Sequence, residues 1–461
     1  MIRKAVLPLL ISTLFAAGTA HAGIDLIAIG SISGNYQDLA HHTAAPLESG
    51  IAGNRLGGIG SGLAYAGGTT FLALPDRGPN AVDYGAAPID QTTSYIPRFH
   101  TFDLSLAPNP NYPTEAGSLP QVLTPTLRKT TLLFSRTPLA YAADGAPALN
   151  SPSVHYFSGR SDNFDASKPS TNPNNARLDP ESIRVSRDGK SVFISDEYGP
   201  YIYEFDRASG QRIRAISLPA SFAVSKLSST GSQEISGNTS GRVANKGMEG
   251  LAISPDGKTL IGFEQSPLIQ DGGDGGRANR IVTIDLATGA TKQYIYDNRL
   301  SDKNKNYNSS EILAVSSSQF LILERDGKGL GDGSSAVVKR LYLIDLTGAT
   351  DVSALSGESK LLPHAVTKTL FLDIKTALNA HGIADTDIPA KLEGAAFGPD
   401  VTIDGQVRHT LYLANDNDFD TLEHNPNKFF VFAFGDDDLP GYVPQQLLSR
   451  HHGEHDEHRE H

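Results

Sequence analysis

Five segments of the chain repeat one short plan, and this repetition constrains the fold more than any other feature of the sequence. Each segment opens on a polar or acidic position, continues as a strand, a turn and a second strand, and closes on a polar cluster. In three of them, Asp-Gly dipeptides that favour hairpin turns stand midway between the opening and closing acids. The pattern predicts β-hairpins whose acidic residues meet at the open end. The segments open at Ser61, Glu181, Glu249, Glu311 and Glu393.

A radial arrangement of such hairpins is the β-propeller, in which the inner strands of all blades surround one channel. Most openings are separated by about the length of one four-stranded sheet with its loops, but the gap from Ser61 to Glu181 is long enough for two. We therefore expect an all-β chain that forms a single β-propeller of about six blades, with seven as the alternative. The additional blade is expected between Phe99 and Phe157.

Two further features complete the expected architecture. Residues 107–179 are rich in Pro, Asn and Ser, which predicts a loop-rich insertion over one face. The apolar residues 24–29 are expected to pair with the last strand, residues 429–434, and so to close the ring. The propeller domain is accordingly expected over residues 23–445.

The two ends of the chain differ in composition from the propeller. Residues 1–22 are typical of a secretory signal, with a basic start, an apolar core and an Ala-His-Ala cleavage pattern; an uncleaved anchor is the alternative. No later segment is long and apolar enough to span a membrane, so we expect an exported protein, periplasmic or secreted. Residues 446–461 carry five histidines among acids and are expected to be a disordered tail, either simply solvated or able to capture a transition metal.

Charge and motif content narrow the functional classes. The formal net charge is −12, which leaves no basic surface for general nucleic-acid binding. The absence of cysteine excludes disulfides, thiolate metal sites and a cysteine nucleophile. No P-loop is present, and the glycines beside Ser61 lack the G-x-S-x-G spacing of a serine hydrolase.

Several blocks of the sequence, in order, resemble the phytase-like domain family, also described as esterase-like activity of phytase. They are LGGIGSGL (56–63) with PDRG (75–78), DPES (179–182) with SDEYGP (195–200), EGL (249–251) with FE (263–264), SEI (310–312) with LERD (323–326), and LEG (392–394) with NDNDF (415–419). The resemblance covers nearly all of the chain after residue 22. It implies an exported, propeller-like hydrolase that acts on phosphate or other esters.

The repeated acids are our candidate metal ligands. Clustered carboxylates without cysteine suit hard cations such as Ca²⁺, which takes six to eight oxygen ligands in flexible geometry. The expected ligands of a divalent cation, for which Ca²⁺ is our choice, are Asp76, Glu181, Asp196, Glu249, Glu264, Glu311, Glu393 and Asp416.

Four residues are expected to carry the chemistry. Glu181 and Glu249 would act with the cation, and Arg77 and Arg325 would bind phosphate oxygens. The chain would then be a metal-dependent ester hydrolase, such as a phosphatase, phosphodiesterase or phytase-like enzyme, acting as a monomer on a small-molecule ester. Two alternatives remain: the acids and arginines pair around a structural channel, or the propeller is non-catalytic and binds a ligand or protein at that channel.

Overall fold

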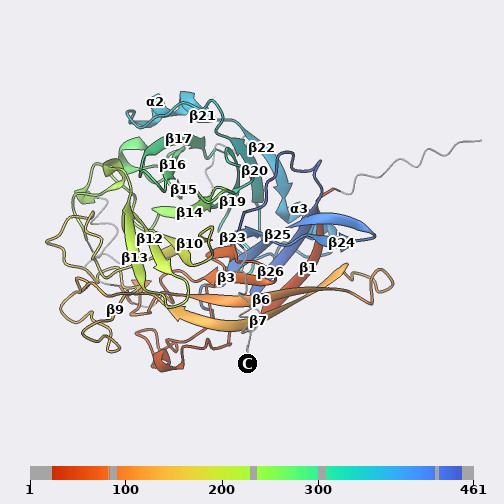
Figure 1. The fold of residues 1–461 in the computed structure, drawn as a ribbon, viewed down its shortest axis with the longest axis horizontal. Coiled ribbons are helices and arrows are strands. Elements are labelled where there is room, and N and C mark those ends of the chain that lie inside the picture. The colour runs from red at the N-terminus through yellow and green to blue at the C-terminus, as the bar shows by residue number, and fades with distance from the viewer. Residues whose placement is uncertain are drawn as a thin grey trace, which may run out of the picture.

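The fold is a β-propeller with five blades. In the computed structural model, which describes residues 23–80, 82–83, 91–228, 236–299, 308–420 and 425–448, five antiparallel sheets surround a central axis (Figure 1). The expectation of a single all-β propeller is confirmed, but the expectation of six or seven blades is wrong.

The blades follow one another along the chain. The first contains β2 (Gly62–Tyr65), β3 (Thr70–Leu74), β6 (Arg98–Pro108) and β7 (Gln121–Leu132). The second contains β10 (Pro180–Val185), β11 (Ser191–Asp196), β12 (Tyr201–Asp206) and β13 (Arg212–Ser217). The third contains β14 (Met248–Ile253), β15 (Thr259–Glu264), β16 (Ala278–Asp285) and β17 (Thr291–Asp297), with β21 (Ala365–Val366) at its edge.

The last two blades complete the ring. The fourth contains β18 (Asn308–Ala314), β19 (Gln319–Arg325), β20 (Lys339–Asp345) and β22 (Lys368–Asp373). The fifth contains β23 (Lys391–Phe397), β25 (Gln406–Asp416), β26 (Asn427–Phe434) and β1 (Asp25–Ile32), with β24 (Val401–Ile403) beside β25. The connections hold β4 (Val82–Asp83), β5 (Gln91–Thr92), β8 (Phe134–Ser135), β9 (His155–Tyr156), α2 (Glu358–Leu361), α3 (Ile374–Ala380) and the 3₁₀ turns η1 (His41–Thr43), η2 (Ala220–Phe222), η3 (Ile269–Asp271) and η4 (Leu362–His364).

The blade expected between Phe99 and Phe157 does not exist. Residues 98–108 and 121–132 form the long outer hairpin of the first blade, β6 and β7. The loop-rich insertion is therefore shorter than expected, because only residues 133–179 connect this blade to the second, with β8 and β9 as their one small sheet. The estimate from segment length gave too many blades, because the long β6–β7 hairpin and the loop after it together contain as many residues as one blade.

Close packing of the five inner strands explains why the ring is small. A Cβ added at Gly62 would lie 3.0 Å from the carbonyl oxygen of Glu181 in the next blade. One added at Gly250 would lie 3.0 Å from the amide nitrogen of Ile312, again in the next blade. Glycine at these positions lets neighbouring inner strands approach backbone to backbone, which suits a narrow channel.

The ring closes as expected. β1 pairs with β26 in antiparallel register, for example Leu26 with Phe432 and Ile29 with Phe430, so the first strand completes the last blade. Both Leu26 and Phe432 are buried, and β1 becomes the outermost strand of the fifth sheet.

The chain ends are described only in part. Residues 1–22 and 449–461, which contain the expected signal and the histidines of the expected tail, lie outside the described residues. The first residues of that tail are held on the propeller, since the amide of Gln446 donates to Pro255 and that of Leu448 to Arg187, both at 2.8 Å. Among the described residues, no helix has the length and apolar character needed to cross a membrane.

Candidate functional site

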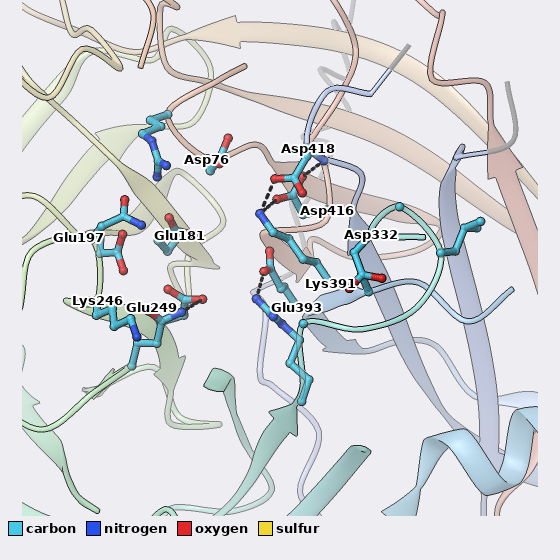
Figure 2. A pocket seen from close by; sticks show the side chains of 18 of the residues that line it. Asp76, Glu181, Glu197, Lys246, Glu249, Asp332, Lys391, Glu393, Asp416 and Asp418 are labelled. Atoms are coloured by element: carbon cyan, nitrogen blue, oxygen red, sulfur yellow. Dashed lines mark hydrogen bonds and ion pairs between the residues drawn. The ribbon is translucent and has the colours of Figure 1, made fainter. Parts of the chain in front are cut away.

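The candidate site is a cavity of about 300 Å³ at one mouth of the channel. Acidic side chains dominate its lining and come from every blade or from the loops that follow the strands (Figure 2). The carboxylates are Asp76, Glu181, Glu197, Glu249, Asp332, Glu393, Asp416 and Asp418, and the cationic groups are Arg77, Lys246, Arg325 and Lys391.

Irregularities in three inner strands place three glutamates at this mouth. In β14, the pairing with β15 passes from Met248 to Gly250 and skips Glu249. β10 and β23 carry the same kind of register shift at Glu181 and Glu393. Such a bulge redirects the side chain of the extra residue. The three glutamates therefore reach one cavity, as the repeat pattern predicted.

Glu181, Glu197 and Glu249 line one side of the cavity, and the buried Asp179 lies beside them; we call these four residues the carboxylate wall. Oxygens of Asp179, Glu181 and Glu197 all lie within 4.8 Å of one another, and all three side chains are buried. Arg77 faces this group and donates to Asp179 through its backbone amide and through Nη1, each at 3.1 Å. Negative charge on the wall is therefore only partly compensated by this arginine.

The electrostatics of the carboxylate wall follow from its burial. Burial raises the pKa of Glu249 to about 8, and the charge of Glu393 adds to the effect. Burial followed by the charge of Glu249 raises the pKa of Glu181 and that of Glu197 well above the ordinary value. In the absence of a bound cation, these side chains hold protons at a pH where exposed carboxylates are ionised.

The opposite side, which we call the paired wall, consists of Arg325, Lys391, Glu393, Asp416 and Asp418. Nη2 of Arg325 donates to Glu393. Nζ of Lys391 donates to Asp416 at 3.1 Å and also to Asp418 (Figure 2). Burial alone would lower the pKa of Lys391, but its two aspartates raise it well above the ordinary value. The positive charges that compensate these carboxylates thus come from side chains of the wall itself, Arg325 and Lys391.

The structure brings most of the predicted residues together. Asp76, with its Oδ1 accepting the amide of Gly78 at 2.9 Å, lies between the two walls (Figure 2). The predicted residues that line the cavity are Asp76, Arg77, Glu181, Glu249, Arg325, Glu393 and Asp416.

Two other predicted ligands, Asp196 and Glu264, close their hairpins but do not line the cavity. They pair in register with Pro180 and Met248, each one position before the opening glutamate. Asp196 is buried and accepts the amides of Asp179 at 3.1 Å and Tyr198 at 3.0 Å, so it shapes the loop behind the carboxylate wall. Both acids point to places other than the mouth because the bulge offsets the two strands.

Glu311 lies deeper in the channel than the other opening glutamates. In β18 the skipped residue is Ser310, and Glu311 pairs with Leu323 at the position that Gly250 occupies in β14. Glu311 is 1% exposed and forms an ion pair with Arg184, Oε2 to Nη2, at 2.9 Å.

Sequence reasoning missed three functional candidates, Asp179, Glu197 and Lys391. Glu197 adjoins the predicted ligand Asp196, and Asp179 lies two residues before Glu181; the choice between these neighbouring acids depended on which ones gather together in the fold. Lys391 begins β23, two residues before the bulged Glu393, and both side chains line the cavity. That spacing was the available signal for a cation on the rim.

Comparison with known proteins places this site in a family. A 311-residue alignment to an uncharacterized secreted protein of Arthroderma benhamiae shows 27% identity over 59% of this chain and 59% of that protein. Among solved structures, the periplasmic gluconolactonase of Pseudomonas aeruginosa aligns with 11% identity, 92% and 98% coverage and a TM-score of 0.31. A luciferin-regenerating enzyme aligns with 11% identity, 91% and 100% coverage and a TM-score of 0.34. Residues 54–419, which include both walls of the cavity, match the profile described as esterase-like activity of phytase, and the chain belongs to this phytase-like family.

Proposed function

We propose that the chain is an exported ester hydrolase that depends on a divalent cation and acts on phosphate esters at the cavity. The observation that carries the proposal is the carboxylate wall, where oxygens of the three buried acids Asp179, Glu181 and Glu197 lie within 4.8 Å of one another, beside Arg77. Such a cluster is costly unless a cation or protons neutralise it. Family membership supports the ester-hydrolase class.

The donor set of the carboxylate wall fits a hard cation. Asp179, Glu181 and Glu197 would hold it, because Ca²⁺ prefers carboxylate and carbonyl oxygens and accepts irregular geometry. When bound, the cation would supply positive charge opposite the developing negative charge of the ester and would make an attacking water more acidic.

The chain's own residues would handle the proton. Glu249 accepts a hydrogen bond at Oε1 from Nε2 of Gln265, at 2.9 Å, which fixes the carboxyl group beside the cluster. Because its pKa is raised to about 8, Glu249 can hold a proton near neutral pH and exchange it with an ester oxygen. Arg77 and Arg325 would orient the phosphate.

A second function is favoured by the ion pairs of the cavity. Arg77 forms an ion pair with Asp179, and Arg325 forms one with Glu393. An anionic substrate would therefore compete with a carboxylate for either guanidinium. A non-catalytic propeller that binds a ligand or protein at the mouth would keep these pairs intact. Hydrolysis requires that at least one arginine exchange its carboxylate for substrate.

Export is proposed from two observations. The first 22 residues have the composition of a secretory signal, and the relative from Arthroderma benhamiae is described as secreted. Cell fractionation of the full chain would show it in the periplasm or medium, whereas retention in the cytoplasm would contradict this part of the proposal.

Hydrolysis assays test the proposed activity directly. Aryl phosphates, phosphodiesters and phytate are incubated with chelator-treated protein, with and without added Ca²⁺. We expect phosphate release that requires Ca²⁺ and that the Glu181→Gln variant lacks. Binding of a ligand at the cavity without turnover of any ester would instead support the non-catalytic propeller.

A further inference from the structure

A buried ion pair joins the inner strands of the second and fourth blades and lies outside the lining of the cavity. Arg184 of β10 and Glu311 of β18 are 3% and 1% exposed, and their side chains meet across the axis at 2.9 Å. Neither residue lines the cavity, so the pair is distinct from the two walls. Equivalent positions on other inner strands hold small residues, such as Gly250, which leaves room for one long acid in the narrow channel.

The hydrogen bonds of this pair reach four of the five inner strands. Glu311 Oε1 accepts the hydroxyl of Ser182 on β10 at 3.0 Å and the amide of Leu251 on β14 at 3.3 Å. Nη1 of Arg184 donates to the carbonyl oxygen of Leu63 on β2 at 2.8 Å, and its Nη2 donates to that of Ile312 on β18 at 3.1 Å.

Two of these contacts are adjacent to the carboxylate wall in the sequence. Ser182 follows Glu181 directly, and Leu251 lies two residues after Glu249. The bulges that turn these glutamates into the cavity lie in the same stretches of β10 and β14. The carboxylate of Glu311 therefore holds the backbone at the point where both glutamates change direction.

We propose that Arg184 and Glu311 are positioning residues that fix Glu181 in the geometry required for cation binding and hold Glu249 in place beside it. The inference rests on the proposed function, in which the carboxylate wall holds a divalent cation. Residues that hold metal-binding side chains in place commonly change metal affinity by about 10- to 100-fold when they are mutated. A pair that only supported the fold would change stability without changing this affinity.

The test compares Glu311→Gln with a matched control, Asp271→Asn. Asp271 is also fully buried, forms an ion pair with an arginine (Arg280, 2.6 Å) and accepts a backbone amide (Gly357, 2.8 Å), but it does not line the cavity or touch the inner strands around it. Ca²⁺ affinity is measured by equilibrium dialysis of chelator-treated protein, and amide hydrogen exchange is measured over β10 and β14.

We expect Glu311→Gln to weaken Ca²⁺ binding about tenfold or more and to speed exchange in β10 and β14. Asp271→Asn should lower the melting temperature yet leave both quantities near the wild-type values. Equal changes in the two variants, or unchanged affinity and exchange in Glu311→Gln, would overturn the positioning role. Should Glu311→Gln not fold, Arg184→Lys, which keeps the charge but replaces the two-pronged guanidinium by a single ammonium group, should show a smaller change in the same direction.

The same data separate this inference from the proposed function. Absence of Ca²⁺ binding in the wild-type protein contradicts the proposed function itself. Hydrogen exchange then still decides whether the pair fixes the two bulged strands, because that measurement needs neither a cation nor a substrate.

Discussion

The two walls of the cavity arise from the same repeat yet differ in charge balance. On the carboxylate wall, Glu181 and Glu249 lie among other buried acids. On the paired wall, Glu393, at the equivalent bulge of β23, is neutralised by Arg325. A repeated glutamate at one position of the fold can therefore serve two purposes, and the neighbouring residues decide which.

This difference indicates which wall needs a bound cation or protons. On the paired wall, Arg325 and Lys391 each contact a carboxylate and counteract the effect of burial, which still raises the pKa values of Glu393 and Asp418. The carboxylate wall must take up protons or a cation, because burial and mutual repulsion raise the pKa values of its acids. We therefore expect equal substitutions on the two walls to have unequal and partly opposite effects.

The largest effect on stability is expected at the paired wall. Glu393→Gln leaves the buried guanidinium of Arg325 without its partner, and breaking a buried ion pair from one side costs about 3 kcal/mol or more. Glu181→Gln removes one charge from a repulsive cluster and should leave the cation-free protein as stable as the wild type or more stable. Urea unfolding in the presence of chelator compares the two; a similar loss in both variants would remove the distinction between the walls.

The second expected effect is on activity, and here substitutions on the carboxylate wall should matter more than those on the paired wall. Glu181→Gln and Glu249→Gln should each reduce kcat/KM for phosphate-ester hydrolysis about a hundredfold or more. The amide at position 181 removes a charged cation ligand, and the amide at position 249 cannot exchange a carboxyl proton. Steady-state kinetics at saturating Ca²⁺ measure this loss, with circular dichroism as the check on folding. Full activity in both variants would contradict catalysis at the carboxylate wall.

The pH dependence of stability gives a third, smaller contrast. Glu249 has a pKa raised to about 8 in the folded state, above its ordinary value of 4.5, so the folded state binds more protons between these values. Stability of the cation-free protein should therefore fall as pH rises from about 4.5 to about 8, at most by about 1.4 kcal/mol per pH unit for this group. Melting curves across that range should show a shallower decline for Glu249→Gln; identical slopes would argue against a protonated Glu249.

The sequence predicted the repeated hairpins well, but it did not predict the number of blades or the exact position of the bulge in each inner strand. Hairpin turns and repeated acids predicted a propeller and brought Glu181, Glu249 and Glu393 to one mouth. The five-blade count could not be read from residue spacing, because the long hairpin of β6 and β7 and the connection after it use as many residues as a blade. Glu311 illustrates the other limit, because a one-residue shift of a bulge moves a side chain from the mouth to the channel interior.

A weaker effect is expected at the arginines. Arg77→Ala should raise KM about tenfold while changing kcat less, because it removes charge-assisted donors that would hold the phosphate. Initial rates over a wide range of substrate concentration separate the two parameters. A loss confined to kcat would indicate instead that Arg77 acts by holding Asp179, which its Nη1 contacts at 3.1 Å.

The smallest effect is expected at the end of the chain. Deletion of residues 449–461 removes all five histidines of the expected tail but keeps the backbone contacts of Gln446 and Leu448. Activity with Ca²⁺ and the melting temperature should therefore stay close to the full-length values. A marked loss of either would show that the tail takes part in the site.

Equilibrium dialysis of Ca²⁺ against chelator-treated protein lacking residues 449–461, with elemental analysis of the bound metal, tests the central claim most directly. The deletion removes histidines that could bind metal independently of the cavity. We predict saturable Ca²⁺ binding that Glu181→Gln abolishes or weakens strongly and that Glu393→Gln largely retains. Absence of bound Ca²⁺ in the truncated protein without further substitutions, or an equal loss of binding in the two variants, would contradict a cation site on the carboxylate wall.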